Sequence, residues 1–283
     1  MKINKGVLFF IVVITILAPI LYIRIEYRYP KSELPTNIYL YNKNTYLYHY
    51  NNLTEAEKEV YNEYVNAFLY LDKKVLLKNK LSVNSEYKVY EAIAHDHPDI
   101  YYMPKRKCRL SMITKKIDFC EFIYPYTKQE IDKFTSIFED KINSIVIEAN
   151  KLNNDYEKIK YVHDIIIDMA DYDDNTLTDK TYSSNDYQSI VSILTTGKSV
   201  CCGYTKLFQV ILNRLNINAT SFYDNDFIDN SSYGHIWNAV KLDNKWYYVD
   251  VTWDDNDIDK YYYFLNSKDE FYQTHTEIND YLN

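Results

Sequence analysis

Glycine is scarce in this chain, and the few glycines that remain constrain its fold more than any other residue type. The 283 residues include only Gly6, Gly197, Gly203 and Gly234. A residue without Cβ is needed where the backbone adopts a positive φ or approaches another segment closely, so we expect each remaining glycine to meet such a need. Three of the four lie beside Cys201 or His235, and the three tryptophans follow shortly after His235. This clustering indicates a constrained site.

The helix expected to start at Cys201 offers a nucleophile. Apolar residues at helical spacing predict a helix over 201–215, with Cys201 in its first turn. The positive end of the helix dipole stabilises a thiolate at that position. An inert buried thiol is the ordinary alternative for a single cysteine, but the residues gathered around Cys201 favour a catalytic thiol.

A predicted hairpin brings a histidine and a carboxylate together. Two strand-like runs, 236–242 and 246–253, are separated by the dipeptide at 243–244. With a two- or four-residue turn, His235 and Asp250 project from the same face of the hairpin. Asp250 can then hold one imidazole nitrogen of His235 while the other nitrogen faces a thiol, which is the arrangement that nucleophilic acyl transfer requires.

Three sequence blocks resemble the core of the transglutaminase-like superfamily of papain-like thiol enzymes. In chain order they are GKSVCCGY, GHIWN and WYYVDVTWD, which follow the patterns G-x-x-x-C-x-G-Y, H-x-W-N and W-Y-x-V-D-x-T-W-D. The likeness is greatest to the bacterial secreted or membrane-bound branch. It implies an α+β fold in which the helix that carries the nucleophile packs on an antiparallel sheet.

The resemblance implies a role for each residue of a catalytic triad. Cys201 is the expected nucleophile, His235 the general base and Asp250 the group that orients the histidine. Cys202 stands where members of the superfamily often carry an acidic or a small residue, so a second thiol adjoins the nucleophile and is a less favoured candidate for its role.

Three residues of the matched blocks are expected to line the substrate site: Tyr204, Trp237 and Asn238. The alternative for each is a place in the core or in a turn. No metal or cofactor is expected. The pair His95 and His97 precedes a proline and is typical of a loop, and adjacent cysteines chelate zinc poorly compared with C-x-x-C.

The region before the core is expected to hold helices and a second hairpin. A capping box at 54–57 and apolar spacing from Thr127 onward each predict a helix start. Cys108 and Cys120 face each other across a predicted turn, so a disulfide is plausible, and two free thiols are the alternative. We divide the chain into a membrane helix at 1–23, a stalk at 24–53, a helical and hairpin region at 54–126, and a catalytic core at 127–283.

The N-terminus predicts a membrane anchor. The run from Gly6 to Ile23 has no charged residue, and Lys2 and Lys5 precede it. Its length is near the minimum for a spanning helix, which favours an uncleaved signal anchor over a cleaved signal peptide. We therefore expect a single-pass protein of the cell membrane whose catalytic domain is extracellular.

The expected activity is acyl transfer from a protein carboxamide or a peptide carbonyl, through a thioester on Cys201, to an amine or to water. The expected partners are a protein or peptide substrate, which can be associated with the cell wall, and the membrane. A net charge of -8 argues against a nucleic-acid partner, because phosphate contacts need clustered cations. A cysteine peptidase of the same fold is one alternative, and a catalytically silent binding or wall-scaffolding module is the other.

Overall fold

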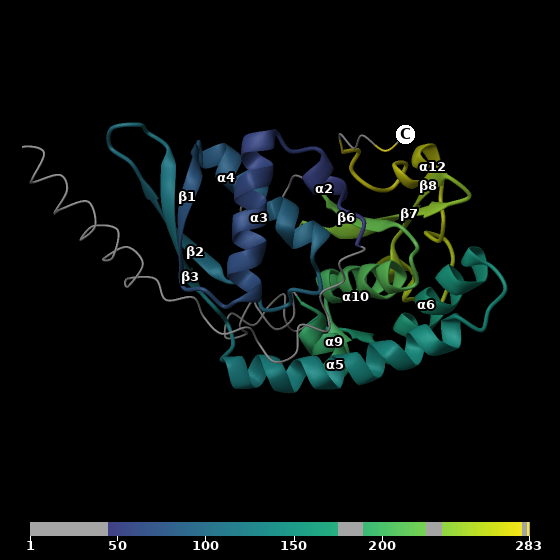
Figure 1. Ribbon diagram of the computed structural model, residues 1–283. Coiled ribbons are helices and arrows are strands. Elements are labelled where there is room, and N and C mark those ends of the chain that lie inside the picture. The colour runs from purple at the N-terminus through teal and green to yellow at the C-terminus, as the bar shows by residue number, and fades with distance from the viewer. Residues whose placement is uncertain (1–44, 175–188, 225–233, 279–281, 283) are drawn as a thin grey trace, which may run out of the picture.

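The computed structural model describes residues 45–174, 189–224, 234–278 and 282. The predicted membrane helix at 1–23 and most of the predicted stalk lie outside these ranges. Within them, no helix is both long and apolar enough to span a bilayer. The described residues form a mixed α/β structure with a three-stranded antiparallel sheet on either side of the molecule (Figure 1). The expected combination of helices and antiparallel sheet is therefore confirmed, whereas the predicted domain boundaries stay a prediction.

The first sheet is built from residues that precede the matched sequence blocks. Its region contains α2 (Tyr48–Asn51), α3 (Glu55–Leu69), β1 (Lys74–Leu81), α4 (Val83–Asp96), β2 (Lys105–Leu110) and β3 (Ile117–Ile123). The strands lie in the order β1-β3-β2, and α3 and α4 pack beside them (Figure 1). The expected hairpin corresponds to β2 and β3, but β1 was not anticipated.

Capping side chains fix where two of the helices begin. Thr54 accepts a hydrogen bond from the backbone N–H of Glu57, and the Glu57 carboxylate accepts one from the backbone of Thr54. Thr127 and Glu130 form the same capping box at the start of α5 (Lys128–Ala149). Each box satisfies backbone N–H groups that have no partner inside the helix, so these helix starts are encoded locally.

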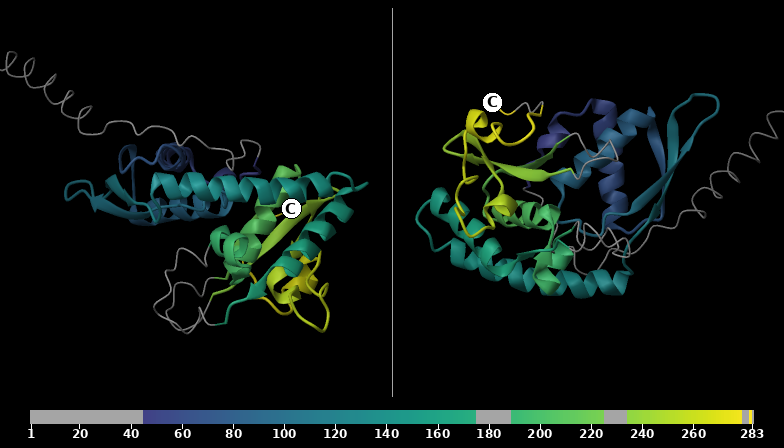
Figure 2. Two further views of the ribbon diagram at one scale, coloured as in Figure 1. Left: turned by 90° about the horizontal axis from the view of Figure 1, so that it is seen from below. Right: turned by 180° about the vertical axis from the view of Figure 1, so that it is seen from behind.

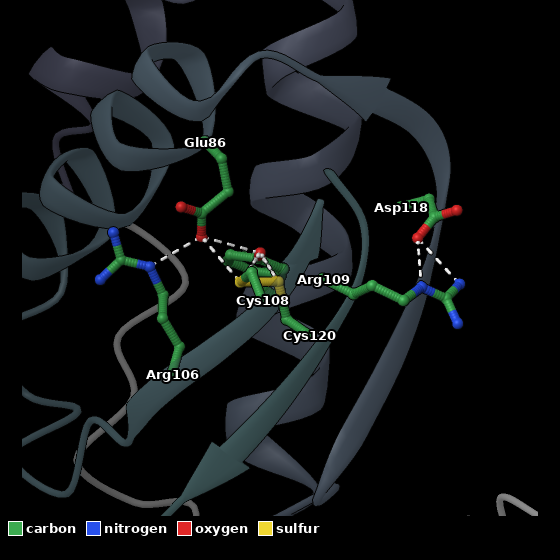
Figure 3. Close-up of a disulfide and its surroundings, with 7 residues drawn as sticks. Glu86, Arg106, Cys108, Arg109, Asp118 and Cys120 are labelled. Atoms are coloured by element: carbon green, nitrogen blue, oxygen red, sulfur yellow. Dashed lines mark hydrogen bonds and ion pairs between the residues drawn. A yellow bond between two sulfur atoms is a disulfide. The ribbon is translucent and has the colours of Figure 1, made fainter. Parts of the chain in front are cut away.

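A disulfide joins the two strands of the first hairpin. Cys108 lies opposite Cys120 in the register of β2 and β3, and their sulfurs are bonded, so the disulfide alternative is confirmed. The buried carboxylate of Glu86 lies next to this bond and accepts hydrogen bonds from Arg106 Nε at 2.7 Å and from the Tyr64 hydroxyl at 2.9 Å (Figure 3). Its charge is therefore balanced by a guanidinium that does not lose its proton.

The second sheet and its helices form the rest of the molecule. The elements are α6 (Asp155–Met169), β4 (Asp171–Tyr172), α9 (Ile190–Thr196), β5 (Lys198–Ser199), α10 (Cys201–Arg214), β6 (Ala219–Tyr223), β7 (Ile236–Leu242), β8 (Lys245–Val249), α11 (Val251–Asp254) and α12 (Lys268–Phe271). The sheet order is β6-β7-β8, and the short strands β4 and β5 pair in parallel. α10 is buried along most of its length, while α5 runs beneath both halves of the molecule (Figures 1 and 2).

The second hairpin ends earlier than the sequence indicated. β7 and β8 turn through Asp243 and Asn244, whose φ angles of 50° and 62° suit a tight two-residue turn. The run expected to continue as a strand to Trp253 leaves the sheet at Val249, which corrects the prediction. Asp250 instead caps α11, because its carboxylate accepts from two backbone N–H groups of that helix.

Candidate active site

Two of the rare glycines position the start of α10. Gly197 ends α9 with a φ of 73°, a conformation that side chains with Cβ rarely adopt. Gly203 packs so closely on Ser199 that an added Cβ would lie 2.0 Å from its Oγ. The expectation that these glycines serve the backbone is confirmed, and together they hold the two thiols of Cys201 and Cys202 in the first turn of a buried helix.

The predicted contact between the histidine and the carboxylate is present. His235 Nε2 donates to Asp250 Oδ2 at 2.5 Å. Asp250 is fully buried, and its other oxygen, Oδ1, accepts from the backbone N–H groups of Thr252 and Trp253 at 3.0 and 3.1 Å. The indole ring of Trp253 stacks on the imidazole with centroids 4.7 Å apart. These contacts fix the orientation of the ring and leave Nδ1 as the nitrogen that can face a thiol.

A second histidine, which the sequence analysis missed, binds the same carboxylate. His275 Nε2 lies 3.0 Å from Asp250 Oδ2, the oxygen that His235 also contacts. Its ring is buried, stacked on Phe271 at 3.8 Å and packed against Trp253 at 4.2 Å. His275 follows the last matched block by many residues, so no motif pointed to it, and only the return of the chain through α12 brings it to Asp250.

These contacts keep Asp250 ionised. Burial alone would raise the pKa of this carboxyl, but the charges and hydrogen bonds of His235 and His275 outweigh burial and lower its pKa to about 2. For His235 the balance runs the other way: burial lowers its pKa, whereas the Asp250 charge and hydrogen bond raise it, with a net increase. The site therefore favours a protonated imidazole beside an ionised carboxylate.

The two thiols of α10 are hydrogen-bonded to each other and share their ionisation. The hydrogen bond with Cys202, followed by burial, raises the pKa of Cys201. The same bond lowers the pKa of Cys202 to about 6 against the effect of burial, with help from the charges of Lys206 and His235. Cys201 in turn accepts a hydrogen bond from the backbone N–H of Ile236, the residue next to His235. One negative charge on the pair is thus stabilised at neutral pH.

The residues assigned to the substrate walls lie in the interior. Tyr204 is fully buried, and its hydroxyl donates to Asp255 at 2.6 Å. Asn238 is also fully buried and donates its amide to the backbone carbonyls of Thr205 and Thr220, each at 3.2 Å. Trp237 is buried beside His235. These contacts are those of core residues that support the site, and contact with a substrate stays a prediction for all three.

A pocket of about 250 Å³ adjoins the thiols on the side of Cys202. Its wall combines Lys206 of α10 and Tyr223 of β6 with Tyr87 and Glu91 of α4. A neighbouring hollow of about 350 Å³ shares Tyr87, Glu91 and Tyr223 and extends toward α2. The sequence analysis did not find this pocket, because half of its wall comes from a helix outside the matched blocks.

A further buried imidazole–carboxylate pair joins α11 to α6. Asp254 is fully buried in α11, and its Oδ2 lies 3.1 Å from Nε2 of His163, which α6 places in the core. Its Oδ1 accepts from the backbone N–H of Tyr263. Packing of α6 against α11 covers Asp254, and the Tyr204 hydroxyl donates to the neighbouring Asp255.

Of the two histidines expected in a loop, His97 follows the end of α4 as its C-cap, but His95 does not lie in a loop. His95 lies in the last turn of α4, where its Nδ1 contacts Ser221 Oγ at 2.8 Å. Asp96 accepts from the backbone N–H groups of His49 and Tyr50 at 3.0 and 2.8 Å. These contacts join α2 and α4 to β6 and so connect the two halves of the molecule.

Among the described residues, one titratable cluster outside the disulfide is compact enough to be considered for a metal: His235, Asp250 and His275. The hydrogen bonds from both imidazoles to Asp250 Oδ2 already account for this geometry. Before a cation could bind, both imidazoles would have to lose their Nε2 protons, and their hydrogen bonds to the Asp250 carboxylate would have to break. The arrangement suits the orientation of an imidazole better than coordination.

Comparison with known proteins identifies the domain around this site. Residues 144–251 match the family model of the transglutaminase-like superfamily, so this segment is a transglutaminase-like domain, and it contains the predicted nucleophile, base and orienting carboxylate. No curated protein matches the chain.

Two solved structures are similar to parts of the chain. One is a crystal structure of a TGase, with 16% identity over 63% of this chain and 50% of that one, at a TM-score of 0.36. The other is a candidate cysteine protease from Cytophaga hutchinsonii, with 17% identity over 48% of this chain and 51% of that one, at a TM-score of 0.32. The chain thus spans about half the length of each.

Proposed function

We propose that the transglutaminase-like domain at residues 144–251 is a thiol enzyme that transfers an acyl group from a protein carboxamide or a peptide carbonyl to an amine or to water. The observation that carries the proposal is the hydrogen bond of His235 to the fully buried Asp250 beside a helix that begins with two thiols. The hydrogen bonds of two imidazoles to Asp250 and its lowered pKa support a catalytic role over a silent binding module, because such shifts gather at functional sites.

In the proposed reaction, Cys201 passes its thiol proton to the Cys202 thiolate, and Cys201 Sγ then attacks the carbonyl carbon. A carbon–sulfur bond forms as the carbonyl oxygen gains the negative charge. The first turn of α10 offers backbone N–H groups without helical partners to stabilise that charge. Protonated His235 gives its proton to the leaving ammonia or amine, and a thioester remains. An amine or water then attacks the thioester, His235 accepts the proton of the attacking group, and Cys201 leaves as a thiolate, which restores the single negative charge on the thiol pair.

The assignment of Cys201 rather than Cys202 rests on its place in the sequence blocks and on its contact with the Ile236 N–H next to His235. Cys202 lines the pocket and carries the lower pKa. Within the proposed mechanism, the Cys202 thiolate accepts the proton of Cys201, and the Cys201 thiolate attacks.

We also propose that the domain faces the outside of a membrane. The uncharged run from Gly6 to Ile23 supports an anchor. The Cys108–Cys120 disulfide supports an oxidising compartment, because structural disulfides are rare where thiols are kept reduced. A protein or peptide substrate, such as one associated with the cell wall, fits that location.

Mass spectrometry of a peptide library incubated with the full chain and a primary amine tests the activity. Amine incorporation or deamidation supports acyl transfer to the amine or to water, whereas chain cleavage identifies the peptidase. Cys201→Ala is the control that should remove every product. Absence of all three products, together with no fast labelling of Cys201 by a thiol-reactive probe, would establish the silent module instead.

A further inference from the structure

The tip of the first hairpin exposes apolar side chains to solvent. Between β2 and β3, Met112 is 87% exposed and Ile113 is 94% exposed, and Leu110 beside them is 48% exposed. Single exposed apolar residues are ordinary on a protein surface, as Ile258 at 96% illustrates. Three exposed apolar residues within four positions of one turn form a small apolar patch.

Basic residues lie on both sides of this apolar patch in the sequence. Residues 105–116 contain six lysines and arginines and no acidic residue, although the chain as a whole has a net charge of -8. Arg109 pairs with Asp118 on the neighbouring strand (Figure 3). Lys115 and Lys116 are exposed and form no ion pair with any residue in the part of the chain that the structure describes. Because Arg106 is also paired, with Glu86, the positive charge at the tip itself comes from Lys115 and Lys116.

The hairpin holds its tip away from the rest of the molecule. It projects beyond α3 and α4 on the side of the molecule opposite β8 (Figures 1 and 2). Its turn is closed by backbone hydrogen bonds from the Ser111 N–H to the Lys116 carbonyl and from the Lys115 N–H to the Ser111 carbonyl, each at 2.9 Å. Backbone groups that are already paired lose less when a segment enters an apolar medium.

An anionic lipid surface fits these features better than a protein partner. A stable protein interface takes about 20–30 residues from each side, far more than this tip presents. A bilayer needs only a few apolar side chains that reach below the headgroups, while lysine stems bring their ammonium groups to the phosphates. Cations near an anionic surface each add to binding.

We propose that the hairpin tip at residues 110–116 is a contact site for anionic membrane lipid, in which Met112 and Ile113 enter the interface and Lys115 and Lys116 bind lipid phosphates. The contact is separate from the apolar N-terminal segment and from the thiol site. It would hold the first sheet against the bilayer and so fix the direction in which the pocket between α4 and α10 opens.

A fluorescent reporter at the tip of the full chain tests the proposal. Thr114→Cys, made with Cys201→Ser and Cys202→Ser so that other reactive thiols are absent, is labelled with an environment-sensitive dye. The protein is reconstituted in vesicles of phosphatidylcholine alone or of phosphatidylcholine with phosphatidylglycerol. We expect the emission to shift to the blue and to gain intensity only with phosphatidylglycerol, and to return toward the value in water at high salt.

Two sets of variants identify the groups responsible. Lys115→Glu with Lys116→Glu should lower the ratio of inserted to solvated dye by about fivefold or more for each lysine. Met112→Ser with Ile113→Ser should abolish the blue shift. A dye at Ile258→Cys, on an equally exposed apolar position outside the hairpin, should stay in water on both kinds of vesicle.

Three results would overturn the proposal. A dye at position 114 that stays in water on anionic vesicles would remove the lipid contact and leave a protein partner as the reason for the surface. An equal shift on both kinds of vesicle would show insertion without recognition of phosphate. A shift of the same size at position 258 would show that the whole domain settles on the vesicle without orientation.

Discussion

The sheets β1-β3-β2 and β6-β7-β8 each lie beside a cysteine pair and a buried carboxylate, but the partners differ. In the first region, Glu86 accepts from Arg106 and Tyr64 next to the Cys108–Cys120 disulfide. In the second region, Asp250 accepts from two imidazoles near two reduced thiols.

The difference shows how the same residue types serve structure in one place and chemistry in another. Arginine keeps its proton at all physiological pH values, and a disulfide has no proton to give, so nothing around Glu86 titrates near neutral pH. Imidazole and thiol both exchange protons in that range. Changes in the first region should therefore affect stability, and changes in the second should affect reactivity.

Replacement of the nucleophile should have the largest effect. Cys201→Ala should lower amine incorporation by about 10⁶-fold, the scale of removing a nucleophile, while the far-ultraviolet circular dichroism and the melting temperature stay near those of wild type. Cys202→Ala should keep most of the activity. The reverse result, with Cys202→Ala inactive and Cys201→Ala active, would move the nucleophile to the thiol with the lower pKa.

Loss of the orienting carboxylate should have the next largest effect. Asp250→Asn should reduce turnover by about 10⁴-fold, because the imidazole loses its fixed orientation and the charge that raises its pKa. Cys201 should still be alkylated by iodoacetamide, as mass spectrometry can verify. Turnover equal to wild type would reduce Asp250 to a helix cap.

Removal of the disulfide should act on stability alone. Cys108→Ser with Cys120→Ser opens a loop with a sequence separation of 12, so the free energy of unfolding should fall by about 3 kcal/mol in urea titrations. The rate at which iodoacetamide alkylates Cys201 should not change in the folded protein. A large change in that rate would mean that the two regions are coupled and that the contrast between them fails.

His275 should act as a positioning residue. His275→Phe should lower turnover by about tenfold, a loss typical of an outer partner of a functional ligand. Because His275 withdraws charge from Asp250, its removal should strengthen the field at His235 and move the limb of the pH–rate profile that reports His235 to higher pH.

Two further variants separate positioning from packing at this residue. His275→Gln keeps a donor near Asp250 and should restore the wild-type profile. His163→Phe removes another buried imidazole–carboxylate pair, the one with Asp254, so it should lower the melting temperature and leave the profile in place. A His275→Phe variant with unchanged profile would make this histidine a core residue only.

The smallest expected effect concerns the charge of Lys206. The pKa of Cys202 is lowered to about 6, so alkylation of the thiol pair should rise with pH through a midpoint near 6 and slow below it. Lys206→Met should move that midpoint to higher pH, but by only part of the amount by which the pKa of Cys202 is lowered. The hydrogen bond from Cys201 lowers this pKa more than the charge of Lys206 does. Lys133→Met, at an exposed position of α5, is the matched control and should not move it.

The sequence by itself determined the features that depend on neighbouring residues. The capping box at Thr54 needs only the residue three positions later, so that helix start was predicted, and the start at Thr127 was predicted from apolar spacing. The contact of His235 with Asp250 was predicted from side-chain parity in a hairpin with a two-residue turn, and it is present although both residues lie one position outside the strands. The cysteine and glycine pattern marked the start of α10 for the same local reason.

β1 shows the alternating exposure of a strand, but its sequence does not show the matching alternation of apolar and polar residues. Its exposure alternates with period two, with lysines at 74, 78 and 80 facing outward. Leu76 points outward and Asn79 inward, against the hydrophobic pattern, so the strand was overlooked. Only its pairing with β3 makes the alternation evident.

Only the tertiary structure decided which distant groups meet. His275 reaches Asp250 because the chain after α11 folds back through α12, and Asp254 is buried because α6 brings His163 against it. The pocket beside Cys202 exists because α4 packs near α10 and β6, a contact held by the hydrogen bonds of His95 with Ser221 and Gln209. Such contacts depend on how whole elements pack, and packing is set by the sum of many weak apolar contacts rather than by spacing along the chain.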